Sequence, residues 1–349
     1  MTIRTAVLGY GVSGRVFHAP FLDHDDGYSL DFIVTGDAQR AAQAAAEHPG
    51  ATVLPGAADL FARASDVDLV VVGTPPWTHD ELATTALERG LHVVVDKPFA
   101  PTAAQAALLV ARAERAGRQL TVFQNRRWDG DFRTLRGLVD RGALGEVHTF
   151  ESRFEWWQPG GFRGWKARAT VAEGGGILYD LGSHLVDQAV VLFGPVERVW
   201  ADVVTRGDAA ADDEALVVLT HANGTRSRLF MSGLAARPAP RFHVLGSAAG
   251  YTKWGLDPQE AALVAGAKPG DAGFGHEPPE NPGTLGVPGD ARPVEPEPGD
   301  YGRFYRLLDA ALAGTGPLPV DPVDAVTVLE LLERAHQSAD EGRKAESIR

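Results

Sequence analysis

Short apolar runs alternate with helix-like segments over the first 124 residues. The run at 67–73 is typical of a strand that is buried on both faces of a parallel sheet. Three of the helix-like segments, 38–47, 78–89 and 102–116, are followed by Gly or Pro. This order predicts a doubly wound α/β domain with right-handed crossovers. The predicted strands are 3–8, 30–35, 67–73, 91–95 and 120–123, and the predicted helices are 13–22, 38–47, 78–89 and 102–116.

The pattern changes after residue 124, where the apolar runs become longer and partly alternating. Residues 222–225, Ala-Asn-Gly-Thr, are typical of a hairpin turn. We therefore expect a second α+β domain with a largely antiparallel, open sheet, so that the domains are 1–124 and 125–349. The predicted strands are 147–157, 196–206, 215–222, 225–232 and 241–245.

Two later segments lie outside this pattern. Residues 257–300 are rich in Pro, Gly and acidic residues and predict a long surface loop, with an active-site lid as the alternative. Residues 322–343 carry an apolar stripe at helical spacing, and we expect this helix to pack back on the first domain. The stripe consists of Val326, Leu329, Leu332 and Ala335.

Length and composition narrow the class of protein. A chain of 349 residues exceeds the usual size of one core, which agrees with two domains. The net charge of −13 argues against nucleic acid and anionic membranes as partners, and no apolar run approaches the ~18 residues of a membrane span. The absence of cysteine excludes disulfides, thiolate metal sites and a cysteine nucleophile. The N-terminal residues read as a core strand without a secretory leader, so we expect a cytoplasmic protein.

The first strand runs directly into a G-x-G-x-x-G pattern. Gly9 permits the tight turn, Gly11 lets the backbone approach a pyrophosphate, and Gly14 lets the helix lie close to the strand. The helix N-terminus supplies N–H groups and the positive end of its dipole. The pattern alone is weak, but a strand before it and a helix after it predict a dinucleotide site that includes Val12 and Ser13.

Ligands of open α/β sheets bind beyond the carboxyl ends of the strands. The strand at 91–95 ends at Asp96 and Lys97, and a lysine there can donate to a substrate oxygen and stabilise a developing alkoxide. The alternative is a solvated lysine at a strand end. Pro98 favours a fixed turn that aims Lys97.

A second polar pair lies in the predicted helix 177–193. Asp180 and His184 are four residues apart and share one face, so the carboxylate can orient the imidazole as a general base. An ordinary surface pair is the alternative. A metal site that adds His79 or His92 is not supported, because no H-E-x-x-H or comparable set is present.

Six segments together resemble one family. They are G-Y-G-V-S-G at 9–14, F-H-A-P-F at 17–21, T-P-P-x-x-H at 74–79, D-K-P-F at 96–99, F-Q-N-R-R-W-D at 123–129 and L-Y-D-L-G-S-H-L-V-D-Q at 178–188. In this order they resemble the Gfo/Idh/MocA oxidoreductases, in particular the branch that holds NADP-dependent scyllo-inositol dehydrogenase. The resemblance extends over residues 3–342.

The resemblance implies reversible hydride transfer between a nicotinamide and a carbinol carbon of a cyclic polyol or sugar. It implies that Lys97, Asp180 and His184 are catalytic and that the C-terminal sheet forms a homodimer or homotetramer. We expect no metal, because the residues offer no comparable ligand set. The predicted cofactor-binding residues are Gly9, Gly11, Val12, Ser13, Gly14, Thr35, Asp37, Thr74, Pro75, His79, Asp96, Lys97 and Asn125. The predicted substrate-binding residues are Lys97, Trp157, Arg163, Trp165, Tyr179, Asp180 and His184, although the aromatic residues among them suit core packing equally well.

The sequence departs from the family pattern at two places, and the second bears on the cofactor. Asp96 stands where the family usually has Glu, which keeps the charge and shortens the reach. Asp37 follows Gly36 where NADP-using relatives tend to carry a Ser-Arg pair. An acidic group there binds the ribose hydroxyls of NAD and repels a 2′-phosphate, so we expect NAD to be preferred over NADP, with Arg40 as the counter-argument.

Two other functions remain open at this point. The first is a non-catalytic dinucleotide-binding sensor on the same fold, against which the presence of Lys97, Asp180 and His184 argues. The second is NAD-assisted glycoside hydrolysis, which would proceed without net reduction of the cofactor.

Overall fold

The computed structural model describes residues 2–206 and 209–345. The chain forms two compact units, and each unit is built from more than one segment of the sequence. The first unit comprises Met1–Asn125, Pro258–Phe274 and Asp300–Val326, and the second comprises Arg126–Asp257, Gly275–Gly299 and Thr327–Arg349.

The first unit contains a six-stranded parallel sheet in the order β3-β2-β1-β4-β5-β6. This is the strand order of dinucleotide-binding folds, so the doubly wound sheet predicted from the sequence is confirmed. Every residue of β4 is buried, as its continuous apolar run predicts. The strands are β1 (Ile3–Leu8), β2 (Tyr28–Val34), β3 (Thr52–Leu54), β4 (Leu69–Val72), β5 (His92–Asp96) and β6 (Leu120–Phe123).

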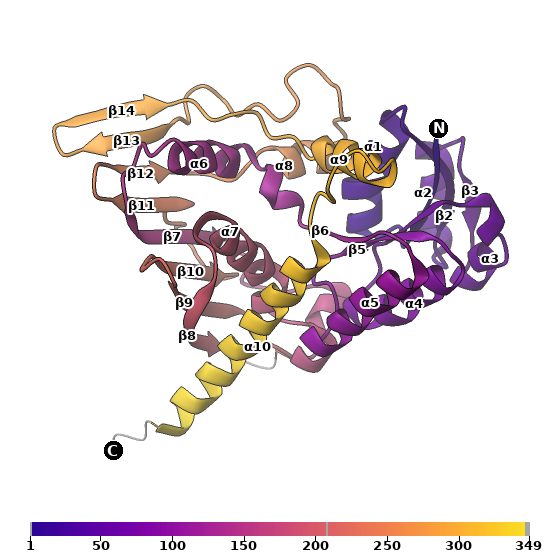
Figure 1. The fold of residues 1–349 in the computed structure, drawn as a ribbon, viewed down its shortest axis with the longest axis horizontal. Helices are drawn as coiled ribbons and strands as arrows, with labels where there is room; N and C mark the ends of the chain where they lie inside the picture. Colours follow the sequence, from indigo (N-terminus) through magenta and orange to yellow (C-terminus); the bar gives the residue numbers. More distant parts are fainter. Residues whose placement is uncertain (1, 207–208, 346–349) are drawn as a thin grey trace. The chain divides into compact units, whose positions relative to one another are not determined.

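Helices cover both faces of this sheet. Figure 1 shows α4 (His79–Glu88) and α5 (Ala103–Ala116) side by side on one face, and α1 (Ala19–His24) with α9 (Gly302–Leu312) on the other. The predicted helix 13–22 is present as a π-helical turn, η1 (Ser13–His18), followed by α1. The other helical segments are α2 (Ala38–Glu47), α3 (Ala57–Phe61), η2 (Ala64–Asp66), η3 (Pro76–Thr78) and α8 (Gln259–Val264), and η4 (Asn125–Trp128) leads from this unit into the second.

An aromatic cluster joins η1 to the late segment that carries α9. The His18 ring lies 4.3 Å from the Phe123 ring, and Phe123 packs at 4.8 Å on Phe304. His18 is fully buried, and its Nδ1 lies 2.6 Å from the hydroxyl oxygen of Tyr305. The core of the first unit therefore depends on residues from both ends of the sequence.

Burial of His18 predicts a specific loss of stability in acid. Desolvation lowers the pKa of His18 from 6.5 to about 4, so the unfolded chain binds a proton below pH 6.5 that the folded chain excludes. Above pH 6.5, His18 is neutral in both the folded and the unfolded chain, so its burial does not lower the free energy of unfolding. As the pH falls from 6.5 toward 4, the free energy of unfolding decreases, because only the unfolded chain takes up the proton. Urea unfolding at pH 7 and pH 4.5 should show that the wild type loses about 2 to 3 kcal/mol more than His18→Gln. Equal losses in the two proteins would contradict this assignment.

The second unit contains an eight-stranded mixed sheet in the order β14-β13-β12-β11-β7-β10-β9-β8. Neighbouring strands are antiparallel except for β7 and β10, which confirms a largely antiparallel sheet. The strands are β7 (Val147–Glu155), β8 (Val196–Val204), β9 (Glu214–His221), β10 (Arg226–Ser232), β11 (Phe242–Gly246), β12 (Gly250–Lys253), β13 (Gly283–Val287) and β14 (Asp290–Val294).

The prediction of one long surface loop over 257–300 is wrong. This segment contributes α8 to the first unit and the hairpin β13–β14 to the second. Leu263 and Leu285 are buried, so each part contributes an apolar anchor to its unit. The abundance of Gly, Pro and acidic residues reflects the exposed side chains of β14 and the turns between the elements.

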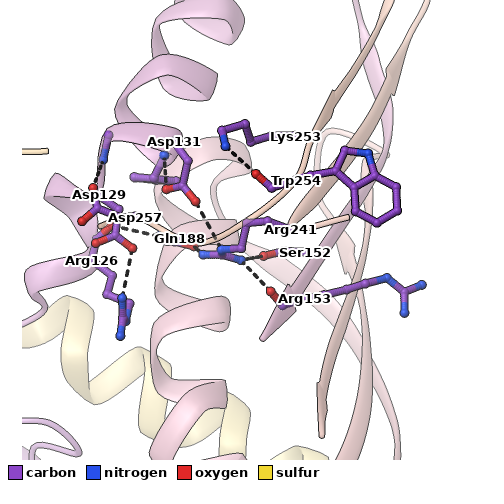
Figure 2. Close-up of polar contacts among 12 residues, drawn as sticks. Arg126, Asp129, Asp131, Ser152, Arg153, Gln188, Arg241, Lys253, Trp254 and Asp257 are labelled. Atoms are coloured by element: carbon purple, nitrogen blue, oxygen red, sulfur yellow. Dashed lines mark hydrogen bonds and ion pairs between the residues drawn. The ribbon is translucent and has the colours of Figure 1, made fainter. Parts of the chain in front are cut away.

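A buried arginine joins the helices of the second unit to its sheet. Figure 2 shows the Arg241 guanidinium between Ser152 of β7, at 2.6 Å, and Gln188, at 2.8 Å. Asp131 lies 3.5 Å from the Arg241 Nε, and both side chains are at most 1% exposed. A buried charge is tolerated only when it is paired and hydrogen-bonded. This network therefore fixes the helix that contains Gln188 against β7.

The helices of the second unit include the long C-terminal helix, which begins in the first unit and continues in the second. Across the described ranges, no helix has both the length and the apolar character needed to span a bilayer. The helical segments are α6 (Gly130–Asp140), η5 (Gly164–Ala167), η6 (Val171–Glu173), η7 (Leu178–Gly182), α7 (Ser183–Phe193) and α10 (Pro322–Ala345).

Candidate active site

The glycine loop after β1 is closely packed on itself. A Cβ on Gly14 would lie 1.9 Å from the carbonyl oxygen of Gly9, so no other residue fits at this position. Gly9 has φ +96°, and its Cβ would lie 2.8 Å from the carbonyl oxygen of Gly73, which follows β4. These close approaches draw the ends of β1 and β4 together at the start of η1.

The outer side of the same loop is open. A Cβ on Gly11 would meet only the Arg40 Nη1, at 3.9 Å, and Val12 is 62% exposed. The Ser13 hydroxyl is buried and has no hydrogen-bond partner among the described residues. An open glycine cradle with an unused hydroxyl donor at a helix start fits the pyrophosphate of a dinucleotide.

The predicted ribose-binding residues follow β2. Asp37 is exposed and caps α2, because its Oδ1 accepts a hydrogen bond from the Arg40 backbone N–H at 2.9 Å. The Thr35 hydroxyl lies 3.4 Å from the Asp37 backbone nitrogen. The cap therefore fixes the Asp37 carboxylate at the exposed start of α2 and leaves its charge at the surface.

His79 ties the loops after β4 and β5 together. It is fully buried, with Nε2 2.8 Å from the Thr74 carbonyl oxygen and Nδ1 3.0 Å from that of Pro98. Pro75 accepts a hydrogen bond from the Thr78 hydroxyl at 2.7 Å, which closes the turn before α4. His79 therefore connects the loop after β4 to the loop after β5 from a buried position in the first unit.

Lys97 stands on the second of these loops. Its backbone N–H donates to the Asp96 Oδ1 at 2.9 Å, and the Lys97–Pro98 peptide bond is cis. The Lys97 side chain is half-buried, whereas Asn125, after β6, is buried. The first unit thus places the glycine loop, Thr74 and Lys97 at one edge of its sheet, as the parallel strand order requires.

The second unit carries the predicted acid–base pair. The helix predicted over 177–193 is present, but it begins with the π-helical turn η7 before it continues as α7. Asp180 lies in η7, and its Oδ2 is 2.7 Å from the Nζ of Lys166. His184 lies in the first turn of α7, is 4% exposed and faces the Phe154 ring at 6.5 Å. π-Helical turns of this kind are frequent at functional sites.

The predicted substrate-binding residues have different environments. The Lys166 ammonium lies 5.9 Å from the centre of the Trp165 ring and also bonds to Asp180. Lys166 therefore links Trp165 to Asp180. Tyr179 is buried and stacks on His336 at 5.5 Å, and burial raises the pKa of its phenol. Trp157 is 58% exposed, and Arg163 is exposed at the start of η5.

The ion pair between Lys166 and Asp180 was missed by reasoning from the sequence. The two residues are 14 positions apart, and an irregular segment with two short 3-10 turns separates them. Lys166 beside Trp165 was visible as a cation next to an aromatic ring. No periodicity links such a residue to a helix further along the chain, so its partner could not be identified.

Models of known families match both units. The model of an oxidoreductase family with an NAD-binding Rossmann fold matches residues 3–124. The model of the GFO/IDH/MocA C-terminal domain matches residues 132–252. These matches agree with the glycine loop in the first unit and with the mixed sheet in the second.

Full-length relatives agree with both matches. The uncharacterized oxidoreductase YdgJ of Escherichia coli is 39% identical over 97% of this chain and 96% of its own length. The scyllo-inositol 2-dehydrogenase (NADP(+)) IolW of Bacillus subtilis is 32% identical over 98% of this chain and 95% of its own. The solved structure of YvaA from Bacillus subtilis superposes with a TM-score of 0.91 at 32% identity, covering 98% of this chain and 97% of that chain. The chain therefore belongs to the Gfo/Idh/MocA family of oxidoreductases, which bind NAD through a Rossmann fold.

Proposed function

We propose that this oxidoreductase transfers hydride reversibly between a nicotinamide dinucleotide and a carbinol carbon of a cyclic polyol or sugar. The first unit would bind the dinucleotide, and the second would supply the acid–base residues and most of the substrate contacts. One observation carries the proposal: Lys97 lies at the same sheet edge as the open glycine cradle, on a loop fixed by Asp96 and His79. The relative named as a scyllo-inositol 2-dehydrogenase supports the substrate class.

The chemistry divides among three side chains. A nicotinamide dinucleotide held at the loop of Gly9, Gly11 and Gly14 would supply the acceptor or donor of hydride. His184 takes the hydroxyl proton as that carbon is oxidised, and Asp180 orients the imidazole and stabilises its positive charge. Lys97 donates a hydrogen bond to the same oxygen and stabilises the charge that develops on it. Lys166 holds the Asp180 carboxylate from its other side.

We infer that NAD is preferred over NADP. The exposed Asp37 carboxylate, fixed by its cap on α2, would bind ribose hydroxyls and repel a 2′-phosphate. Arg40 is the group that would receive such a phosphate, and the relative IolW is named for NADP. Steady-state kinetics with both cofactors decides the matter: kcat/KM should be higher with NAD, and a higher value with NADP would contradict the inference.

We further propose that copies of this chain associate through the sheet of the second unit. Leu216 and Val218 of β9 and Phe230 of β10 have half-buried side chains between the buried positions of their strands. Trp200 of β8 is 52% exposed. A homodimer or homotetramer would cover these apolar side chains, and light scattering measures the mass directly.

A panel of inositols and aldoses tests the proposed reaction. With NAD or NADP present, at least one cyclic polyol or sugar should produce absorbance at the reduced-nicotinamide band. If no polyol or sugar produces this absorbance with either cofactor, the result would contradict the proposal and favour a non-catalytic dinucleotide-binding sensor. Release of a sugar from a glycoside without net cofactor reduction would instead identify NAD-assisted hydrolysis.

A further inference from the structure

A buried carboxylate holds the start of the helix that carries Asp180. The backbone N–H of Ile177 donates to the Asp212 carbonyl oxygen at 2.8 Å. The next N–H, of Leu178, donates to the Asp212 Oδ2 at 2.7 Å. Helix N-termini leave their first N–H groups without intrahelical partners, so Asp212 acts as a cap supplied from a distant part of the chain.

The Asp212 side chain packs so closely against the start of this helix that no further side-chain atom fits between them. Gly176 has φ +97°, and a Cβ there would lie 2.3 Å from the Asp212 Oδ1. The Gly176 carbonyl accepts the Asp180 backbone N–H at 3.0 Å, so the same glycine forms the first turn around Asp180. A displacement of Asp212 would therefore be transmitted directly to the backbone of Asp180.

The other sides of η7 are also closely packed. A Cβ on Gly182 would lie 3.2 Å from the Met231 sulfur of β10 and 3.3 Å from a methyl carbon of Leu332 in α10. The His336 Nε2, also in α10, lies 3.9 Å from the Asp212 Oδ1, and the His336 ring stacks on Tyr179. Asp212 is 1% exposed, and this burial raises the pKa of its carboxyl group. The segment before β9 is thus built into the support of η7.

We propose that Asp212 is a positioning residue for the reaction, because it fixes the start of η7 and thereby the directions of Asp180 and His184. The proposal rests on the proposed function. Asp212 is distant from this helix in the sequence, because it lies 32 positions after Asp180. It reaches η7 because it lies just before β9, which is the neighbour of β10 in the sheet. Asp212 itself touches backbone rather than substrate, so it acts through the helix that it caps.

Three variants separate capping from charge and from general destabilisation. Asp212→Ala removes the acceptor, and Asp212→Asn keeps an oxygen for Leu178 while removing the charge. Asp213→Ala is the matched control, because it removes a neighbouring carboxyl group whose residue bonds through its backbone to Val204 and Gly233. If Asp212→Ala does not fold, Asp212→Ser replaces it, since its shorter hydroxyl is a poor substitute for the carboxylate at this distance.

Two measurements are made on each full-length variant. In Asp212→Ala, amide hydrogen exchange should accelerate about tenfold in residues 177–184 while the strands of the first unit remain unchanged. Its kcat should fall about 10- to 100-fold, with the KM for the cofactor unchanged, because misplaced acid–base groups slow the chemical step. Asp212→Asn should restore kcat to within about threefold of the wild type, and Asp213→Ala should match the wild type in both measurements.

Several results would overturn the proposal. Unchanged exchange in residues 177–184 would show that Asp212 does not fix the helix. Faster exchange with wild-type kcat would show that the reaction does not need this support, and an equal loss of kcat in Asp213→Ala would show a general effect. If the wild type oxidises no polyol, the proposed reaction fails, and the exchange measurement still decides separately whether Asp212 fixes η7.

Discussion

Lys97→Met should lower kcat/KM about 10²- to 10³-fold, the range seen when one donor to a developing oxyanion is removed. Methionine keeps an unbranched apolar side chain as far as the ε position but has no ammonium group. The loop itself should remain in place, because Asp96 bonds to the backbone N–H of residue 97 and His79 bonds to the carbonyls that follow it. Steady-state kinetics on the best substrate of the polyol panel gives the ratio.

The dissociation constant of the cofactor separates a chemical defect from a binding defect. We expect the constant to change less than about threefold in Lys97→Met, because the glycine cradle does not involve the lysine ammonium. Lys268→Met is the matched control, since it removes an exposed lysine from the same unit. A Lys97→Met variant that kept half of the wild-type kcat would remove Lys97 from the mechanism.

His184→Asn should lower kcat about 10²- to 10⁴-fold, the contribution expected of a general base. Asparagine can still donate and accept hydrogen bonds in the buried first turn of α7, but it cannot take up a proton near neutral pH. Steady-state kinetics with the best substrate of the polyol panel measures the loss.

His243→Asn serves as the control for this second variant. His243 lies half-buried on β11 of the same unit and bonds to the Thr252 hydroxyl at 3.1 Å, so its replacement tests the loss of an ordinary histidine. We expect wild-type kinetics from this control. A His184→Asn variant that kept half of the wild-type kcat would leave His184 with a structural role.

Five of the six strands of the first unit's sheet were predictable because their signals are local, whereas the three-residue strand β3 was not predicted. β4 is an unbroken apolar run, and α5 ends at Gly117 with a left-handed φ of 61°. The glycine motif could be assigned to a strand–loop–helix unit for the same reason. The hairpin β13–β14 could not be identified, because its turns and exposed side chains dominate its composition and only Leu285 provides a core anchor.

The candidate site could be proposed from the sequence where its residues follow strands or share a helix. Lys97 follows β5 directly, and Asp180 and His184 lie one turn apart, so short-range rules indicated all three as candidates, and their catalytic roles stay predictions. Lys166 and Asp212 bond to η7 from 12 or more positions away and from irregular segments. Such contacts depend on the tertiary fold, and no periodic pattern within one sequence predicts which distant residues the fold brings together.

The interleaving of the two units has a consequence for synthesis of the protein. The chain changes unit five times, after residues 125, 257, 274, 299 and 326. During translation, Phe123 lacks the Phe304 ring and His18 lacks the Tyr305 hydroxyl until residues 304 and 305 emerge from the ribosome. Synthesis of the nucleotide-binding unit therefore begins first, but the unit is complete only when residues 300–326 have been made. A ribosome stalled after residue 124 would leave apolar surface of this unit uncovered and accessible to chaperones.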